Sequence, residues 1–386
     1  MHFRFLLSDP HGDRELSPED LEQPFLISPG EQHPFLTLAD YFGAVQKFIM
    51  LNDGNLLCSA IKRQSLQTDI NLSDISEVFI RSEKHGAYYH ISSVEIIGPG
   101  ENFKFAVTAA LSEYARPSLG EEYFILQQLS ETSSDFIPKT YCKEPVRWKT
   151  DSGSEEFLMI LGEWLKGYHE WHASDDPDSG NRKIYLWDYK NGYRFLTDAE
   201  SYKILRQAAC ILTYYYDQAS FRQIYPWHHG AGDFVVKTGP GPLSVKLISA
   251  RQYDPLVHFD QAKEADRLVA TIQFLLNLTL RMRLDRLEGV GKPAWLGAFA
   301  VDAAVAGFFA GLAGTRAEDR LQVGPVADFL EIMQSFDVQE INDMYESLLE
   351  IYAEEDQDDF RLIRKELAGH AVELHEVLQA FTLVKP

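Results

Sequence analysis

The sequence predicts an α+β protein in which a small antiparallel sheet precedes a larger helical region. Between residues 75 and 165, short runs rich in β-branched and aromatic residues are interrupted by glycine turns, which is typical of antiparallel strands. From residue 198 onward, long segments carry apolar residues at helical spacing. The length of 386 residues suits one large two-lobed domain or two domains.

The first half of the chain is expected to begin with an irregular arm. Five prolines and scattered acids over residues 1–37 predict this arm, and the apolar spacing over residues 38–52 predicts a helix. Polar residues at 173–184 predict a loop. Between this helix and this loop we expect strands at 76–83, 87–97, 103–111 and 155–165, with a second helix at 118–131 between the last two strands.

The second half is expected to be mainly helical, with one hairpin between Asp233 and Ser249. Helices are predicted at about 198–220, 258–287, 295–313, 325–335, 338–353 and 357–381. Residues 294–313 are almost wholly apolar, and Asp302 in their middle favours a buried helix over the alternative of a membrane span. Residues 321–360 lack Lys and Arg and form either a solvated acidic face or a docking patch for a basic partner.

The composition is globular and strongly acidic. Asp and Glu number 58 against 36 Lys and Arg, which gives a formal net charge of −22. Such a surface repels phosphate backbones and anionic lipid, so it argues against nucleic acid and membranes as partners. The three cysteines, Cys58, Cys142 and Cys210, are widely spaced and suit a reducing compartment. We therefore expect a cytoplasmic protein.

Several segments between about residues 75 and 310 resemble, in their order, the protein-kinase-like fold, and more closely its aminoglycoside and choline phosphotransferase branch. Residues 105–110 look like the third strand of the small lobe, and residues 122–129 look like the helix that carries the glutamate of that family. Residues 157–167 are similar to the fifth strand and hinge, and residues 232–249 to the hairpin that leaves the catalytic loop. The resemblance implies a two-lobed fold, with ATP and Mg²⁺ as cofactors.

The resemblance assigns roles in the larger lobe, where the catalytic positions have changed. Phosphoryl transfer needs oxygen ligands for Mg²⁺ and an aspartate that orients the attacking hydroxyl. Aligned through Gly232, His228 occupies the position of the catalytic aspartate and Asp233 that of the metal-binding asparagine. Ser249, which carries no charge, occupies the position of the second metal-binding aspartate. Asp233 and Ser249 are therefore the candidate metal ligands.

In the smaller lobe the resemblance points to nucleotide-binding positions. Thr108 occupies the position of the phosphate-binding lysine, while Glu122 keeps the family's glutamate. Lys104 lies on the same strand face as Thr108, so it either reaches the phosphates and pairs with Glu122 or is a solvent-exposed edge lysine. Glu163 and Leu165 fall in the hinge, where the resemblance implies contacts with the nucleotide.

Arginine, histidine and carboxylate residues of this region each have alternative interpretations. Arg251 either offsets phosphate charge or forms a structural ion pair with one of the many acids. His228 could act as a general base, because the imidazole pKa lies near neutrality. Histidines and carboxylates could also bind zinc or iron, or they could be packed structural residues. The candidate metal-binding group comprises His169, Glu170, His172, His228, His229 and Asp233.

We expect an N-terminal extension (1–74), a kinase-like small lobe (75–172), a large-lobe core (173–310) and a helical C-terminal annex (311–386). The leading functional hypothesis is a pseudokinase whose interlobe cleft binds a small molecule or a protein partner. A divergent ATP-dependent phosphotransferase, acting on a hydroxylated small molecule, is the first alternative. A non-catalytic interaction module that uses its acidic C-terminal helices is the second. The oligomeric state does not follow from the sequence.

Overall fold

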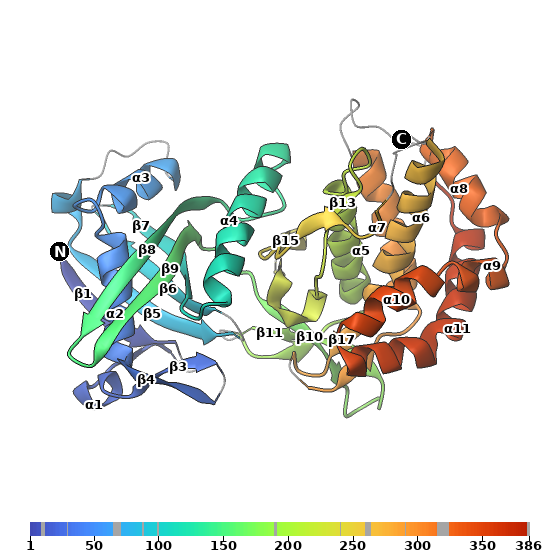
Figure 1. Ribbon diagram of the computed structural model, residues 1–386. Coiled ribbons are helices and arrows are strands. Elements are labelled where there is room, and N and C mark those ends of the chain that lie inside the picture. The colour runs from blue at the N-terminus through green and yellow to red at the C-terminus, as the bar shows by residue number, and fades with distance from the viewer. Residues whose placement is uncertain are drawn as a thin grey trace. The chain divides into compact units, whose positions relative to one another are not determined.

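The computed structural model describes residues 1–8, 12–28, 30–64, 71–86, 89–98, 100–188, 191–239, 241–258, 264–289, 291–314 and 324–383. The chain forms two compact units, Met1–Lys166 and Gly167–Pro386 (Figure 1). Each unit combines helices with strands, which confirms the predicted α+β class. The finer domain boundaries at residues 74, 172 and 310 stay predictions.

A seven-stranded sheet forms the first unit, in the order β2-β1-β5-β6-β7-β9-β8. Its strands are β1 (His2–Leu7), β2 (Arg14–Glu15), β5 (Glu77–His85), β6 (His90–Ile97), β7 (Asn102–Ala110), β8 (Thr140–Thr150) and β9 (Gly153–Glu163). Neighbouring strands are antiparallel except β1 and β5, which are parallel. The sheet is therefore larger than the predicted antiparallel one, because it also includes the start of the chain.

The N-terminal segment is an integral part of the first unit, so the prediction of an irregular arm over residues 1–37 is wrong. Besides β1 and β2 it contains α1 (Pro18–Leu21) and the hairpin of β3 (Pro24–Ser28) and β4 (Glu31–Thr37). Two of its prolines occupy places where a missing N–H is tolerated. Pro18 opens α1, and Pro24 opens an edge strand.

Helices pack on the sheet and close its core. The predicted helix at 38–52 is α2 (Leu38–Ile49), which is followed by α3 (Asn55–Gln64) and a 3₁₀ turn at Leu72–Asp74. Tyr41, Phe42 and Phe48 of α2 are fully buried together with Phe105 and Phe157 of the sheet. The helix predicted at 118–131 is α4 (Ala115–Thr132), which lies between β7 and β8 in the chain.

The second unit contains several small sheets. These are β10 (Glu170–Asp175) with β11 (Arg182–Trp187) and β12 (Arg194–Phe195); β13 (Arg222–Ile224) with β16 (Tyr253–Pro255); β14 (Phe234–Lys237) with β15 (Ser244–Leu247); and β17 (Leu284–Arg286) with β18 (Pro293–Trp295). The predicted hairpin between Asp233 and Ser249 is confirmed as β14 and β15. The segment 173–184 is not a plain loop: its ends pair in β10 and β11, and only its middle turns.

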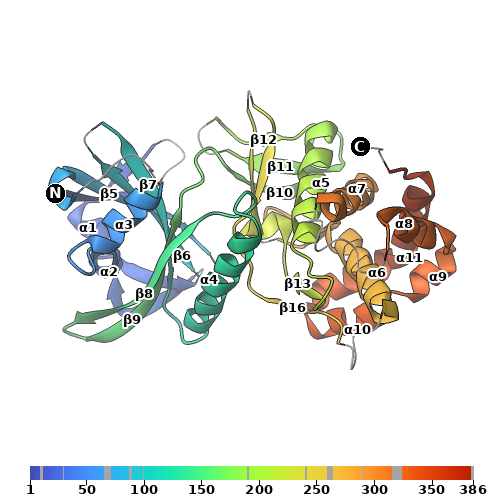
Figure 2. The same ribbon diagram turned by 90° about the horizontal axis from the view of Figure 1, so that it is seen from above.

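The rest of the second unit is a helical bundle (Figure 2). Its helices are α5 (Asp198–Tyr214), α6 (Glu264–Arg281), α7 (Phe299–Gly314), α8 (Val326–Ser335), α9 (Val338–Asp343), α10 (Glu346–Glu354) and α11 (Gln357–Ala380). The apolar stretch forms α7, which packs along α5 and buries most of its side chains, as predicted for a core helix. Among the described residues, no helix combines the length and the apolarity needed to cross a bilayer.

Candidate functional site

A short loop in the second unit carries the predicted catalytic residue. The chain leaves β13, passes Trp227 and His228, and makes a single π-helical turn over His229–Asp233 before β14 begins. Gly232 has a φ of 87°, a left-handed value that glycine adopts without steric cost. π-Helical turns are rare in proteins, but those that do occur are frequently found at functional sites. The glycine at position 232 therefore permits the backbone conformation of this loop.

Asp233 is buried, and its carboxylate is fully engaged. The residue is 2% exposed. Nη2 of Arg251 lies 2.6 Å from its Oδ1, and Nη1 of the same guanidinium lies 3.3 Å from its Oδ2. The backbone N–H of His228 also donates to Oδ2, at 2.7 Å. Arg251 thus forms the structural ion pair that was one of its two interpretations.

His228 sits next to a buried carboxylate. Its side chain is 13% exposed, and its Nδ1 lies 3.5 Å from Oδ1 of Asp285. Within the described residues, neither ring nitrogen makes a hydrogen bond. Burial lowers the pKa of His228 well below its ordinary value of 6.5, and the neighbouring His229 lowers it further. The ring is therefore neutral at pH 7.

His229 lies deeper in the unit and packs as a core residue. It is fully buried, and its ring stacks on that of Trp171, whose Nε1 donates to His229 Nδ1 at 3.3 Å. Burial lowers the pKa of His229 to about 3. This neutral, ordered ring fits the packing interpretation of the histidine pair.

Asp285 is the residue of this site that the sequence did not indicate. It lies in β17, is fully buried, and accepts hydrogen bonds from the backbone N–H groups of Ala173 and Arg286, both at 2.7 Å. Burial raises the pKa of Asp285 to about 7. A Cβ atom on Gly230 would lie 2.0 Å from Oδ1 of Asp285, so the absence of a side chain at Gly230 leaves room for the carboxylate. Nothing in the arginine-rich segment around Asp285 distinguishes it from a surface acid.

The alternative group of histidines and carboxylates does not form a three-ligand metal cluster among the described residues, and the metal-binding role of Asp233 and Ser249 stays a prediction. In the part of the chain that the structure describes, no three His, Cys, Asp or Glu side chains lie close enough to hold a metal ion. His169 faces Asp188 at 3.6 Å, and His172 faces Glu170 at 3.7 Å. Ser249 follows β15 and is half-buried.

The predicted nucleotide-binding residues lie in the first unit. Lys104 and Thr108 share one face of β7, as the strand alternation predicts. Lys104 Nζ, however, pairs with Glu83 at 3.2 Å and lies 4.0 Å from the ring centre of Trp164. It is therefore neither a solvent-exposed edge lysine nor, through any contact seen here, the partner of Glu122.

The other residues of this group are ordered by local contacts. Glu122 lies on α4 and is only 4% exposed, so its carboxyl is held inside the first unit. Glu163 ends β9, where its Oε2 accepts the backbone N–H of Lys139 at 3.1 Å. Leu165 follows β9 and is half-buried. Their roles in binding a nucleotide stay predictions.

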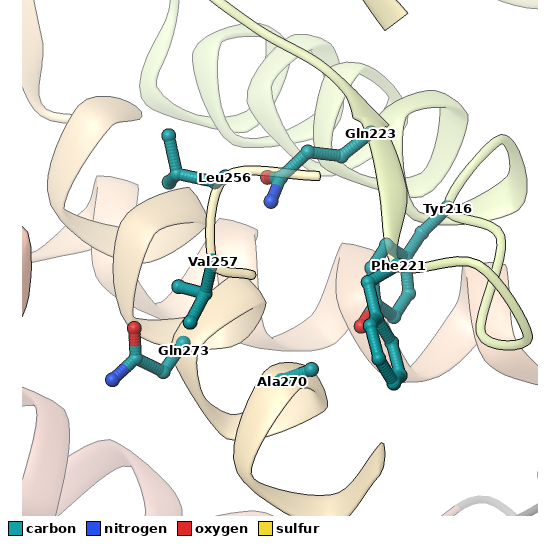
Figure 3. Close-up of a pocket in the computed structure, with 7 residues that line it drawn as sticks. All are labelled: Tyr216, Phe221, Gln223, Leu256, Val257, Ala270 and Gln273. Atoms are coloured by element: carbon teal, nitrogen blue, oxygen red, sulfur yellow. The ribbon is translucent and has the colours of Figure 1, made fainter. Parts of the chain in front are cut away.

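A shallow hollow in the second unit lies apart from these residues. Its open volume is about 210 Å³, but it is too narrow to hold a water molecule. Figure 3 shows its lining, which comprises Tyr216, Phe221, Gln223, Leu256, Val257, Ala270 and Gln273. Because it lacks room for even the smallest ligand, we do not assign it a binding role.

No protein-family model matches this sequence, and no curated protein matches it. Among solved structures, the chain is similar to the crystal structure of the Mycobacterium tuberculosis PknI kinase domain, in a double-mutant form. The identity is 13% and the TM-score 0.30, and the match covers 68% of this chain and 98% of that chain. An identity and a TM-score this low do not establish a shared function.

Proposed function

We propose that this chain is a kinase-like protein that has lost phosphoryl transfer and acts by binding a ligand or a partner. The observation that carries the proposal is the ion pair between Asp233 and Arg251, which occupies the candidate metal ligand with a fixed cation. The order of elements supports the kinase-like part. β5, β6 and β7 are followed by α4, β8 and β9, and the second unit presents a helix, a loop, a hairpin and further helices in that sequence.

Magnesium binding at Asp233 is unfavourable in this arrangement. Mg²⁺ requires near-ideal octahedral oxygen coordination, mainly from carboxylates, phosphates and water. Both oxygens of Asp233 already accept hydrogen bonds, and Arg251 places a positive charge against them. Ser249 adds no negative charge that would offset that repulsion. A metal ion would therefore have to displace Arg251 and to break a bidentate, charge-assisted interaction.

His228 is also poorly suited to the role of general base. An efficient base has a pKa near the working pH, because it must be unprotonated and still accept a proton readily. Burial pushes the pKa of His228 far below neutrality, so its driving force for accepting a proton is small. With a weak base and a blocked metal ligand, the changed positions together favour binding over phosphoryl transfer.

One observation favours the alternative of a divergent phosphotransferase. The carboxylate of Asp285 lies beside Nδ1 of His228, which is the relationship between a catalytic histidine and the acid that orients it. In this alternative, Asp285 would stabilise the imidazolium formed when His228 accepts the proton of a substrate hydroxyl. Asp233 would hold the metal after Arg251 moves away.

Thermal unfolding with ATP separates the two functions. A ligand present at 100 times its dissociation constant stabilises the folded state by about 2.7 kcal/mol. We expect no Mg²⁺-dependent shift of the melting temperature and no ATP turnover. A shift with ATP that persists in EDTA would agree with metal-free binding.

Turnover that requires Mg²⁺ and disappears in the His228→Ala variant would overturn the proposal and establish the phosphotransferase. The Arg361→Ala variant is the matched control, because Arg361 is 75% exposed and pairs only at the surface of α11.

A further inference from the structure

Three acids at the junction of α10 and α11 pair with two arginines of the second unit. The junction, residues 355–359, spans the two residues between the helices and the first three residues of α11. Glu355 Oε2 lies 3.4 Å from Nη1 of Arg281. Nη2 of Arg286 lies 3.0 Å from Asp356 Oδ2 and 2.8 Å from Asp359 Oδ1. We call residues 355–359 the acidic turn. Part of the acidic stretch predicted at 321–360 is thus engaged in ion pairs within the second unit, and residues 321–323 lie outside the described residues.

The acidic turn contacts the start of the 225–233 loop directly. The hydroxyl of Tyr225 donates to Oε1 of Glu355. The guanidinium of Arg281, which pairs with the same Glu355, lies 5.6 Å from the centre of the Tyr225 ring. Tyr225 therefore contacts both Glu355 and Arg281, which also form an ion pair with each other.

A second connection reaches the middle of the loop through Arg286. Its side chain binds the acidic turn, while its backbone N–H donates to Oδ1 of Asp285 at 2.7 Å. The same Oδ1 faces Nδ1 of His228 at 3.5 Å. The backbone N–H of His228 in turn donates to Asp233. The acidic turn is thus linked to both ends of the loop by a continuous set of contacts.

Two of these ion pairs have one deeply buried partner. The side chain of Arg281 is 7% exposed against 28% for Glu355, and that of Asp359 is 10% exposed against 24% for Arg286. Asp356 is 51% exposed, so its pair with Arg286 contributes less to stability. Removing one partner of a buried pair leaves an uncompensated charge, which is strongly destabilising. In the same segment, Asp358 is 65% exposed and pairs with Arg361, which is 75% exposed. Exposed pairs of this kind contribute little to stability, so a substitution of Asp358 can serve as the control within the acidic turn.

We propose that the acidic turn is an electrostatic latch on the 225–233 loop, so that the C-terminal helices set the mobility of the loop that carries His228 and Asp233. While Glu355, Asp356 and Asp359 engage Arg281 and Arg286, the loop is held in the conformation seen here. An event that draws the acidic turn away from these arginines releases the loop. The inference does not depend on whether the loop binds a nucleotide, because it concerns only what holds the loop.

Hydrogen exchange of the full chain, followed by mass spectrometry, tests the latch. In the Asp356→Asn/Asp359→Asn double variant, we expect amides of residues 225–233 to exchange about tenfold faster, because local opening has become easier. Peptides from α7 should exchange as in the wild type. Asparagine is a good helix N-cap, so the capping of α11 by residue 356 is retained. The Asp358→Asn variant is the matched control and should leave the loop unchanged.

Two results would overturn the latch. One is unchanged exchange in the loop when the double variant is folded, since the loop would then be held by other contacts. The other is equally faster exchange in α7 and in the loop, which would indicate a general loss of stability. If the double variant does not fold, Glu355→Gln provides the same test with a smaller change, because it weakens only the contacts with Arg281 and Tyr225. Its faster exchange should centre on Tyr225.

Discussion

The Arg251 guanidinium forms a bidentate ion pair with Asp233, in which each of its two Nη atoms donates to one carboxylate oxygen. The acid is buried, whereas about a third of the Arg251 side chain remains exposed. The pair joins the segment that follows β15 to the end of the π-helical turn, so it fixes the loop in front of β14. Its loss should therefore affect folding as well as any binding at this site.

The Arg251→Met variant should lose about 3 kcal/mol of unfolding free energy, because it leaves the Asp233 carboxylate buried without its cation. Urea denaturation measures this loss. Arg361→Met is the control and should lose less than about 1 kcal/mol, since its pair is exposed. A loss for Arg251→Met no larger than that of the control would mean that the buried carboxylate does not need its partner.

The buried carboxyl of Asp285 should give the protein a specific pH dependence. The folded state holds a proton on Asp285 up to about pH 7, whereas the unfolded chain releases it near 3.8. Between these values the folded state binds more protons, so this group makes stability fall as the pH rises. The Asp285→Asn variant lacks this dependence.

The unfolding free energy of the wild type, relative to that of Asp285→Asn, should therefore decline by roughly 1 kcal/mol per pH unit between about pH 4 and 7 and then level off. The neutral histidines are present in both proteins, so their contributions cancel in the difference. Denaturant titrations at several pH values measure it. A difference that does not change with pH would contradict a raised pKa at Asp285.

The contact between α5 and α7 should tolerate no added methyl group. A Cβ atom on Gly307 would lie 2.3 Å from the backbone oxygen of Arg206. Gly307→Ala should therefore cost about 1–3 kcal/mol through overpacking, as measured by thermal unfolding. Gly369 is exposed in the middle of α11, with no atom within 4 Å of a Cβ. Gly369→Ala should instead stabilise the protein by about 1 kcal/mol, so effects of the same sign at both sites would contradict this packing.

The N-terminal strand should contribute to stability as a core element does. Leu6 of β1 is 6% exposed, so Leu6→Ala should cost about 2–5 kcal/mol. Leu26 of β3 is 39% exposed, and Leu26→Ala should change stability by no more than about 0.5 kcal/mol. Chemical denaturation compares the two. Equal, small effects would contradict a structural role for this strand.

The sequence predicts the regular elements well wherever their periodicity is strong. The strands at β5 to β7, the hairpin of β14 and β15, and most helices from α5 to α11 follow from local patterns. The helix predicted at 258–287 is wrong at its end, where the chain forms β17, and the one predicted at 338–353 is divided into α9 and α10. The prediction of an irregular arm at the start of the chain is wrong because prolines usually interrupt regular structure, whereas Pro18 and Pro24 stand where a helix and an edge strand begin. The pairing of β1 with β5 is non-local and leaves no short-range signal.

The candidate site was predictable only in part. The residues His228, Asp233 and Arg251 are close in sequence, so their proximity could be anticipated, and the structural ion pair of Arg251 was one of its two interpretations. Asp285 comes from a distant strand and enters the site only when β17 is placed beside the loop. The partner of Lys104 was missed for a similar reason, since Glu83 lies two strands away in the sheet.

The pairing of α5 with α7 also has a consequence for synthesis of the chain. The two helices are separated by the hairpins and by α6, so a growing chain exposes the inner face of α5 until α7 has left the ribosome. That face includes Ala209 and Thr213, which are buried in the finished protein beside Gly307 and Gly311 of α7. Truncations that end before α7 should therefore accumulate as insoluble protein.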